Sequence, residues 1–203
     1  MQSISTIGNA TLIAYDNQVP ILSTDPWFGD EDHAYFGSWT LSHEIPAKYK
    51  KDILDSKYVW FSHGHPDHLN PLSLKRLEGK NILLPDHVGS RIYRDLTNKN
   101  KFSIDILPDR SWVQLSKKIR VMCITTIIQD SILLLDIAGR LFINLNDAGT
   151  RGATSFIKQE SKNFQDVYLL SLSGYGDADM INCYDKNGIF IIPPAKNNTR
   201  VGE

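Results

Sequence analysis

The stretch Ser62-His63-Gly64-His65-Pro66-Asp67-His68 decides how the rest of this sequence is interpreted. Three of the six histidines fall within it, with an aspartate between two of them. Imidazole and carboxylate are the ligands that borderline divalent ions such as zinc, iron or manganese accept. Residues two apart in an extended segment project to the same side, so His63 and His65 are expected to bind one ion. The adjacent Asp67 and His68 are expected to face a second position, as in sites that hold two metals.

The alternative interpretation of this stretch is a histidine-rich surface loop. Single histidines are usually surface residues or lie satisfied within a core. Here, however, three of them and an aspartate directly follow the apolar run 58–61, which has the composition of a buried strand. That position favours a metal site.

A second candidate lies at the end of another apolar run, where Asn144-Leu145-Asn146-Asp147-Ala148-Gly149 closes Leu141-Phe142-Ile143. An aspartate at such a place is often a helix cap or a turn residue. The functional interpretation is a carboxylate at a strand end, directed into the same pocket as the histidines and bridging two ions.

Taken together, the 62–68 motif and Asp147 resemble the signature of the metallo-β-lactamase superfamily. In that family the motif follows a buried strand, and a later strand-end aspartate bridges the metals. The resemblance runs from Ile7 to about Ser173. It implies an α+β fold, an αββα sandwich in a single domain over 1–203, with the metal site at one edge between the sheets.

Shorter segments resemble particular branches of the superfamily. Segments 7–11 and 23–27 are similar to the L-ascorbate-6-phosphate lactonase-like branch, whereas 36–39 and 144–147 are similar to the branch with the metallo-β-lactamase-like part of CMP-N-acetylneuraminate hydroxylase. Within them, Asp25-Pro26-Trp27 is either a strand-ending turn with a core indole or part of the pocket lining.

Two ligands that the family usually supplies are absent. The segment 125–131 has no histidine, and none follows His87. Either the chain is a fragment, incomplete at its C-terminal end, or the site is completed differently, by water, Gln129, Asp130 or His87. For His87, just before an expected helix, a capping or packing role is favoured over a ligand role.

The pattern of apolar runs predicts many strands and few helices, which favours α+β layers over a doubly wound sheet. Expected strands are 11–14, 19–23, 58–61, 81–84, 102–107, 112–115, 119–125, 132–137, 141–145, 167–172 and 189–192, and expected helices are 47–54, 71–77, 86–96 and 155–162. The connections are expected to be antiparallel, with a meander over 119–145. The long segment 28–46 has no clear periodicity and is predicted to form the substrate wall, with Trp39 in it.

The composition narrows the classes of partner and compartment. The net charge of −1 gives no electrostatic footprint for nucleic acid. Two cysteines make no disulfide framework, which favours a reducing cytoplasm. No segment approaches the roughly 20 apolar residues of a membrane span. The expected partner is a small-molecule substrate, and the oligomeric state is not readable from the sequence.

Three functions compete. The first is a metal-dependent hydrolase in which His63, His65 and Asp147 bind one ion, and Asp67, His68 and Asp147 bind the other. Asp67 and His68 are its candidate catalytic residues, with Asp67 orienting the nucleophile or moving its proton. The cofactor is one or two divalent ions, zinc first, with iron or manganese as alternatives. The second function is a non-haem iron oxygenase on the same residues, and the third is a non-catalytic metal-binding protein.

Overall fold

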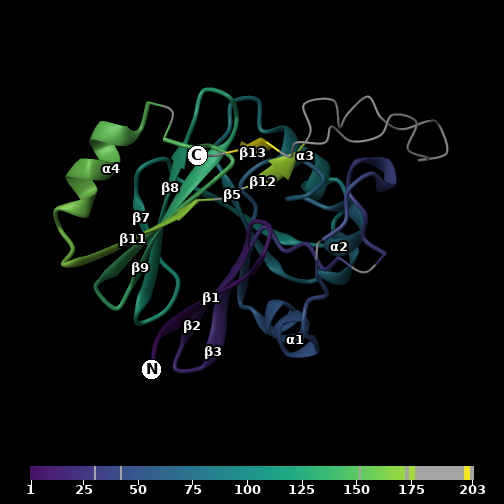
Figure 1. The fold of residues 1–203 in the computed structure, drawn as a ribbon, viewed down its shortest axis with the longest axis horizontal. Helices are drawn as coiled ribbons and strands as arrows, with labels where there is room; N and C mark the ends of the chain where they lie inside the picture. Colours follow the sequence, from purple (N-terminus) through teal and green to yellow (C-terminus); the bar gives the residue numbers. More distant parts are fainter. Residues whose placement is uncertain (30, 42, 151, 172–173, 177–198, 202–203) are drawn as a thin grey trace.

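The computed structural model describes residues 1–29, 31–41, 43–150, 152–171, 174–176 and 199–201. Two sheets lie face to face, with three helices on one side and a fourth on the other (Figure 1). The expected strand 189–192 lies outside the described residues.

The first sheet holds six strands in the order of the sequence. They are β1 (Ser3–Gly8), β2 (Thr11–Asp16), β3 (Val19–Thr24), β4 (Tyr58–Trp60), β5 (Asn81–Pro85) and β6 (Ser103–Leu107). The first three are antiparallel, as expected for short connections, whereas β3 to β6 run parallel. The expectation of antiparallel connections was wrong for this half, because each parallel step is bridged by a helix-containing crossover. These helices are α1 (Ala47–Asp55), α2 (Pro71–Arg76) and α3 (Arg91–Thr97).

The second sheet has the order β11-β10-β9-β8-β7. Its strands are β7 (Trp112–Gln114), β8 (Ile119–Thr125), β9 (Ser131–Ile137), β10 (Arg140–Asn146) and β11 (Asp166–Ser171). The strands β8 to β10 form the antiparallel meander that the sequence predicts, and β7 extends it as a further antiparallel strand. The helix α4 (Thr154–Ser161) then carries the chain to β11, which pairs parallel with β10. A further pair, β12 (Gly174–Gly176) and β13 (Thr199–Val201), is antiparallel.

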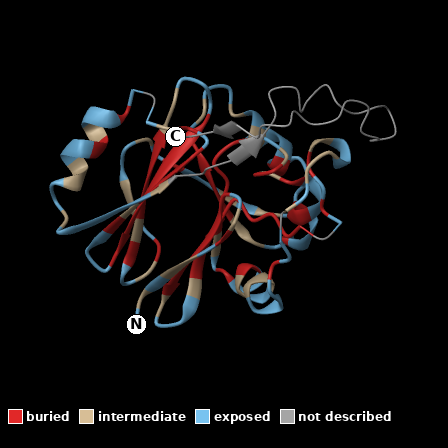
Figure 2. Cartoon of the chain, viewed as in Figure 1, coloured by how far each residue is buried: buried red, intermediate tan, exposed pale blue. Residues whose placement is uncertain are grey.

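Three apolar layers hold the sandwich together (Figure 2). One lies between the sheets and includes Leu22, Trp60 and Leu133. The second fills the space between the first sheet and its helices, and the third lies between the second sheet and α4. Every residue of β9 is buried, because both faces of this central strand are covered. The arrangement is the predicted αββα sandwich.

Helix boundaries follow local backbone chemistry. The side chain of Asn70 caps α2 by accepting hydrogen bonds from the N–H groups of Leu72 and Ser73, as its sequence predicts. The helix α3 begins at Arg91, later than expected, because Gly89 and Ser90 have left-handed φ of +81° and +48°. Val88, which falls within the expected helix 86–96, therefore lies in the preceding turn and is 86% exposed. Among the described residues, no helix is long and apolar enough to cross a membrane.

Replacing Asn70 by alanine tests how much this cap contributes. Its side chain also donates to the carbonyl of Pro66 at 3.0 Å, which ties the motif loop to α2. We expect Asn70→Ala to lower the free energy of unfolding by about 1–2 kcal/mol in urea titrations. The exposed Asn163 provides the control, and equal losses for Asn70→Ala and Asn163→Ala would contradict the capping role.

Candidate metal centre

The motif loop and two aspartates meet where three strands end. Strands β3 and β4 pair with Thr24 opposite Trp60, so Asp25 and the loop 62–68 leave the sheet side by side. Asp147 follows β10 on the other sheet. The site therefore lies at one edge of the sandwich and draws on both sheets.

Asn146 turns the chain so that Asp147 leaves the strand toward the histidines. Its φ is +34°, a left-handed value that asparagine tolerates better than most residues. Its side-chain amide donates to the carbonyl of Ser131 at 2.6 Å, and its side-chain oxygen accepts from the N–H of Asp147 at 2.5 Å. This brace fixes Asp147 relative to β9.

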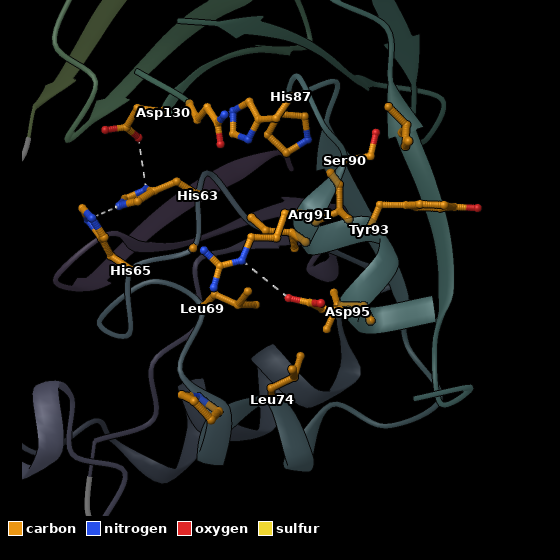
Figure 3. A pocket seen from close by; sticks show the side chains of 18 of the residues that line it. His63, His65, Leu69, Leu74, His87, Ser90, Arg91, Tyr93, Asp95 and Asp130 are labelled. Atoms are coloured by element: carbon orange, nitrogen blue, oxygen red, sulfur yellow. Dashed lines mark hydrogen bonds and ion pairs between the residues drawn. The ribbon is translucent and has the colours of Figure 1, made fainter. Parts of the chain in front are cut away.

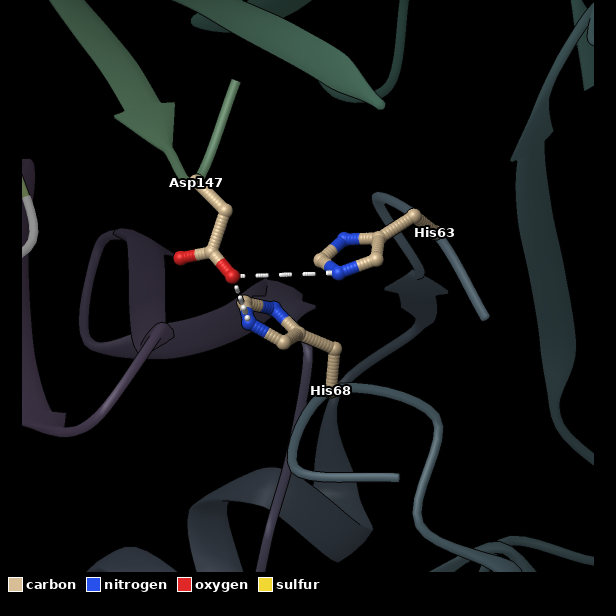
Figure 4. A group of neighbouring side chains, drawn as sticks. All are labelled: His63, His68 and Asp147. Atoms are coloured by element: carbon tan, nitrogen blue, oxygen red, sulfur yellow. Dashed lines mark hydrogen bonds and ion pairs between the residues drawn. The ribbon is translucent and has the colours of Figure 1, made fainter. Parts of the chain in front are cut away.

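His63, His68 and Asp147 form the centre of the site (Figure 4). Asp147 Oδ2 lies 3.1 Å from His68 Nε2 and 3.8 Å from His63 Nε2. One candidate ligand atom from each residue lies within 4.8 Å of the others. The two histidines are buried, whereas the Asp147 side chain is 38% exposed, which leaves the group open on one side.

The other two predicted ligands flank this group. His65 Nδ1 lies 2.8 Å from His63 Nε2, and Asp67 Oδ2 lies 3.4 Å from His68 Nε2. The structure thus brings the five residues predicted from the sequence close together, with His63, His68 and Asp147 at the centre. Which of them bind an ion stays a prediction.

A buried carboxylate holds the far side of each central imidazole. Asp25 Oδ2 lies 3.2 Å from His68 Nδ1, and Asp130 Oδ1 lies 3.0 Å from His63 Nδ1. An imidazole fixed in this way presents Nε2 to the opposite side, which is the usual arrangement of metal-binding histidines. The donor set and its supporting carboxylates therefore fit a divalent ion between His63, His68 and Asp147.

These contacts bear on two alternatives that the sequence leaves open. The first is the role of the segment 25–27, and the second is which residue completes the site in place of the missing histidines. Asp25 is part of the site, whereas Trp27 is a core indole, 2% exposed, that donates to the carbonyl of Asp32. Asp130 lies at the Nδ1 side of His63, away from the Nε2 atom that faces Asp147. His87 contacts the hydroxyl of Ser131 at 2.7 Å, and burial lowers its pKa, in keeping with a packing role.

The electrostatics of the site centre on His68. Burial lowers its pKa, but the carboxylates of Asp147 and Asp25 outweigh burial and raise the pKa to about 11. For Asp147, burial raises the pKa and the contact with His68 lowers it. The contact with His68 outweighs burial, so the pKa of Asp147 is lowered overall. Without an ion, this imidazolium lies between two carboxylates.

Sequence reasoning did not single out Tyr35, which the structure places at the site. Its hydroxyl donates to Asp67 Oδ1 at 3.0 Å, and its ring packs on Trp39 with centroids 4.7 Å apart. Tyr35 and Phe36 both have left-handed φ, +47° and +59°, which bulky residues rarely adopt. Burial and the charge of Asp67 raise the pKa of the Tyr35 hydroxyl, which keeps it a neutral donor. Strain of this kind often occurs at functional sites.

Two solved structures share this fold. The structure superposes on an isothiocyanate hydrolase from Delia radicum gut bacteria with a TM-score of 0.53 and 14% identity, covering 70% of this chain and 61% of that one. It also superposes on a possible metal-dependent hydrolase from Veillonella parvula with a TM-score of 0.56 and 10% identity, covering 85% and 84%. The chain has the metallo-β-lactamase fold. No protein-family model matches it.

By sequence, the chain is similar to proteins that bear the name of a hydroxylase. The chain is 28% identical over 131 residues to the cytidine monophosphate-N-acetylneuraminic acid hydroxylase of Pongo pygmaeus, and 27% identical to the inactive human protein of that name. Each alignment covers 61% of this chain, but only 22% and 26% of the two relatives. These relatives match one of the two branches that the sequence resembles.

The Asp25 contact predicts an effect on metal affinity. In Asp25→Asn, the side-chain oxygen can still accept from the N–H of Ser62, but an NH2 group then faces His68 Nδ1. We expect zinc affinity to fall by about 10–100-fold in competition titrations with a chromophoric chelator. Asp105→Asn, on an exposed residue of β6, is the control, and unchanged affinity for Asp25→Asn would contradict the role of this carboxylate.

The raised pKa of His68 predicts that an ion displaces a proton. At pH 7.5 the imidazole is protonated, since its pKa is about 11, and an ion at Nε2 requires the neutral ring. We expect about one proton released from His68 on zinc binding, measured by calorimetry in buffers with different ionisation enthalpies. Affinity should rise with pH between 6.5 and 8.5, and affinity independent of pH with no proton release would refute this assignment.

Proposed function

We propose that the chain is a metal-dependent hydrolase that cleaves an ester, lactone or phosphoester bond of a small molecule. The observation that carries this proposal is the convergence of His63 Nε2, His68 Nε2 and Asp147 Oδ2, with a buried aspartate behind each imidazole. Two histidines and one carboxylate, with an open position for water, are also the ligand set of known zinc hydrolases. The fold, shared with hydrolases of known structure, supports it.

The residues are assigned to two sets that share Asp147. His63, His65 and Asp147 would bind one ion, and Asp67, His68 and Asp147 the other, with zinc as the first candidate. The contacts of His65 with His63, and of Asp67 with His68, support this division. Two further histidines that are usual in the superfamily are missing from this sequence, which would lower the affinity for metal. The carboxylates that orient the rings would restore part of that affinity.

The chain's own side chains would position the attacking water and the metal-binding imidazoles. When bound, a zinc ion supplies a Lewis acid and lowers the pKa of water to about 7. As the alternative to binding an ion, Asp67, held at Oδ1 by Tyr35 and turned at Oδ2 toward His68, would orient the attacking water and accept its proton. Asp25 and Asp130 hold the imidazoles, so that little reorganisation is needed during the reaction.

A second candidate is a non-haem iron hydroxylase on the same residues. Two histidines and one carboxylate are also the ligand set of iron(II) oxygenases. The sequence similarity to hydroxylases favours this candidate specifically. Since the chain spans about a quarter of the length of those relatives, the activity of the whole proteins is no more than a proposal for it.

Metal content and turnover together separate these functions. We expect one to two zinc ions per chain after purification without added metal, with hydrolysis of esters, lactones or phosphodiesters independent of oxygen. His68→Gln should lower turnover by at least a hundredfold, whereas Asn163→Gln, at an exposed residue after α4, should leave it unchanged. Iron with an absorption band that responds to oxygen would instead support the hydroxylase. Bound metal without any turnover would leave a non-catalytic protein.

Tyr35→Phe tests how far the loop 28–46 contributes to the site. Removing the hydroxyl deprives Asp67 of its donor, and hydrogen bonds to charged groups contribute about 1.5–3 kcal/mol. We expect the turnover number to fall by about tenfold, with the unfolding midpoint little changed. Tyr168→Phe, on β11, is the matched control, and equal turnover of the two variants would show that Tyr35 does not position Asp67.

A further inference from the structure

A pocket of about 400 Å³ opens beside the histidines, between the motif loop, α3 and the turn before β9 (Figure 3). His63 and His65 line one part of it, so the pocket reaches the residues predicted to bind metal. Its volume lies within the range of small-molecule sites. The pocket is therefore wide enough for the body of a substrate whose reacting bond lies at the imidazoles.

Apolar side chains make up about half of the walls of this pocket. They include Leu69, Leu74, Leu84, Ile92, Leu96 and Ile128. Leu84 and Leu96 belong to the core, whereas Ile128 is 49% exposed on the turn before β9. Its neighbour Ile127 is 97% exposed and does not line the pocket. Such walls favour a hydrocarbon chain or ring over a fully polar ligand.

Cationic side chains line the part formed by α3. Arg91 and Lys99 are the arginine and lysine among the lining residues, and Asp95 and Asp130 are the carboxylates, of which only Asp95 lies on α3. Arg91 lies 3.8 Å from Asp95, and its side chain is 87% exposed. An exposed ion pair of this kind contributes little free energy, so the guanidinium of Arg91 can leave Asp95 and bind a ligand anion instead. Figure 3 shows the guanidinium between Asp95 and the two imidazoles.

We propose that this pocket selects an amphipathic organic anion, with its apolar body against Ile92 and Ile128 and its carboxylate or phosphate group on Arg91. Arginine suits this role because its planar fork of donors matches both anions. The inference rests on the proposed function for its last element, which is that the bond to be cleaved lies at His63 and His65. The binding of the anion itself needs no metal.

Binding to the chelator-treated chain tests the proposal apart from catalysis. The probes are 4-phenylbutyrate, 4-phenylbutyl phosphate and the neutral 4-phenylbutanol, each titrated by calorimetry. We expect at least one of the two anions to bind at least tenfold more tightly than the alcohol. Which anion binds better distinguishes a carboxylate from a phosphate substrate. Equal binding of all three probes would overturn the anionic selectivity.

Two matched pairs of variants locate the binding. Arg91→Gln should remove the tenfold preference for the anion, whereas Arg94→Gln, on the same helix but outside the pocket lining, should keep it. Ile128→Ala should weaken all three probes by about threefold to tenfold, whereas Ile127→Ala should not. Equal effects within either pair would overturn the proposed pocket. A loss of turnover in His68→Gln is measured independently, so failure of the hydrolase proposal would leave this binding result standing.

Discussion

The site depends on one buried carboxylate. Asp25 accepts hydrogen bonds from the N–H and the hydroxyl of Ser62, both at 2.7 Å, and lies 3.2 Å from His68 Nδ1. It is fully buried, and a buried carboxylate is tolerated only when its oxygens are satisfied in this way. One side chain thus fixes the start of the motif loop, the ring of its last histidine and the end of β3.

The fold explains why residues so far apart in the sequence meet here. The parallel half of the first sheet places the ends of β3 and β4 at one edge, and the meander returns the ends of β8 and β10 to the same edge of the second sheet. The apolar layers between the sheets hold these ends in register, and the Asn146 brace directs Asp147 to the histidines. Asp130, whose carboxylate supports the ring of His63, directly precedes β9 and so lies at this edge as well.

Most strand positions could be predicted from the sequence because apolar periodicity is a local property, and the layers followed from the resemblance of the 62–68 motif to a known family. The five predicted ligands do lie near one another, but their binding of an ion stays a prediction. The sequence did not reveal the start of α3, which depends on two left-handed residues, or the parallel half of the first sheet. The roles of Asp130 and Tyr35 were also hidden, since each acts through a contact distant in sequence. The segment 125–131, which has no histidine, contributes the carboxylate of Asp130, and only the fold shows that this carboxylate lies at His63 Nδ1.

Anomalous diffraction from crystals soaked with zinc would show whether His63, His68 and Asp147 bind a metal ion. We expect one or two ions at about 2.0–2.2 Å from the Nε2 atoms of His63 and His68 and from a carboxylate oxygen of Asp147. Asp25 and Asp130 should remain on the Nδ1 sides of the rings without contacting an ion. No ion at saturating zinc, or an ion bound through the Nδ1 atoms and Asp130, would contradict this expectation.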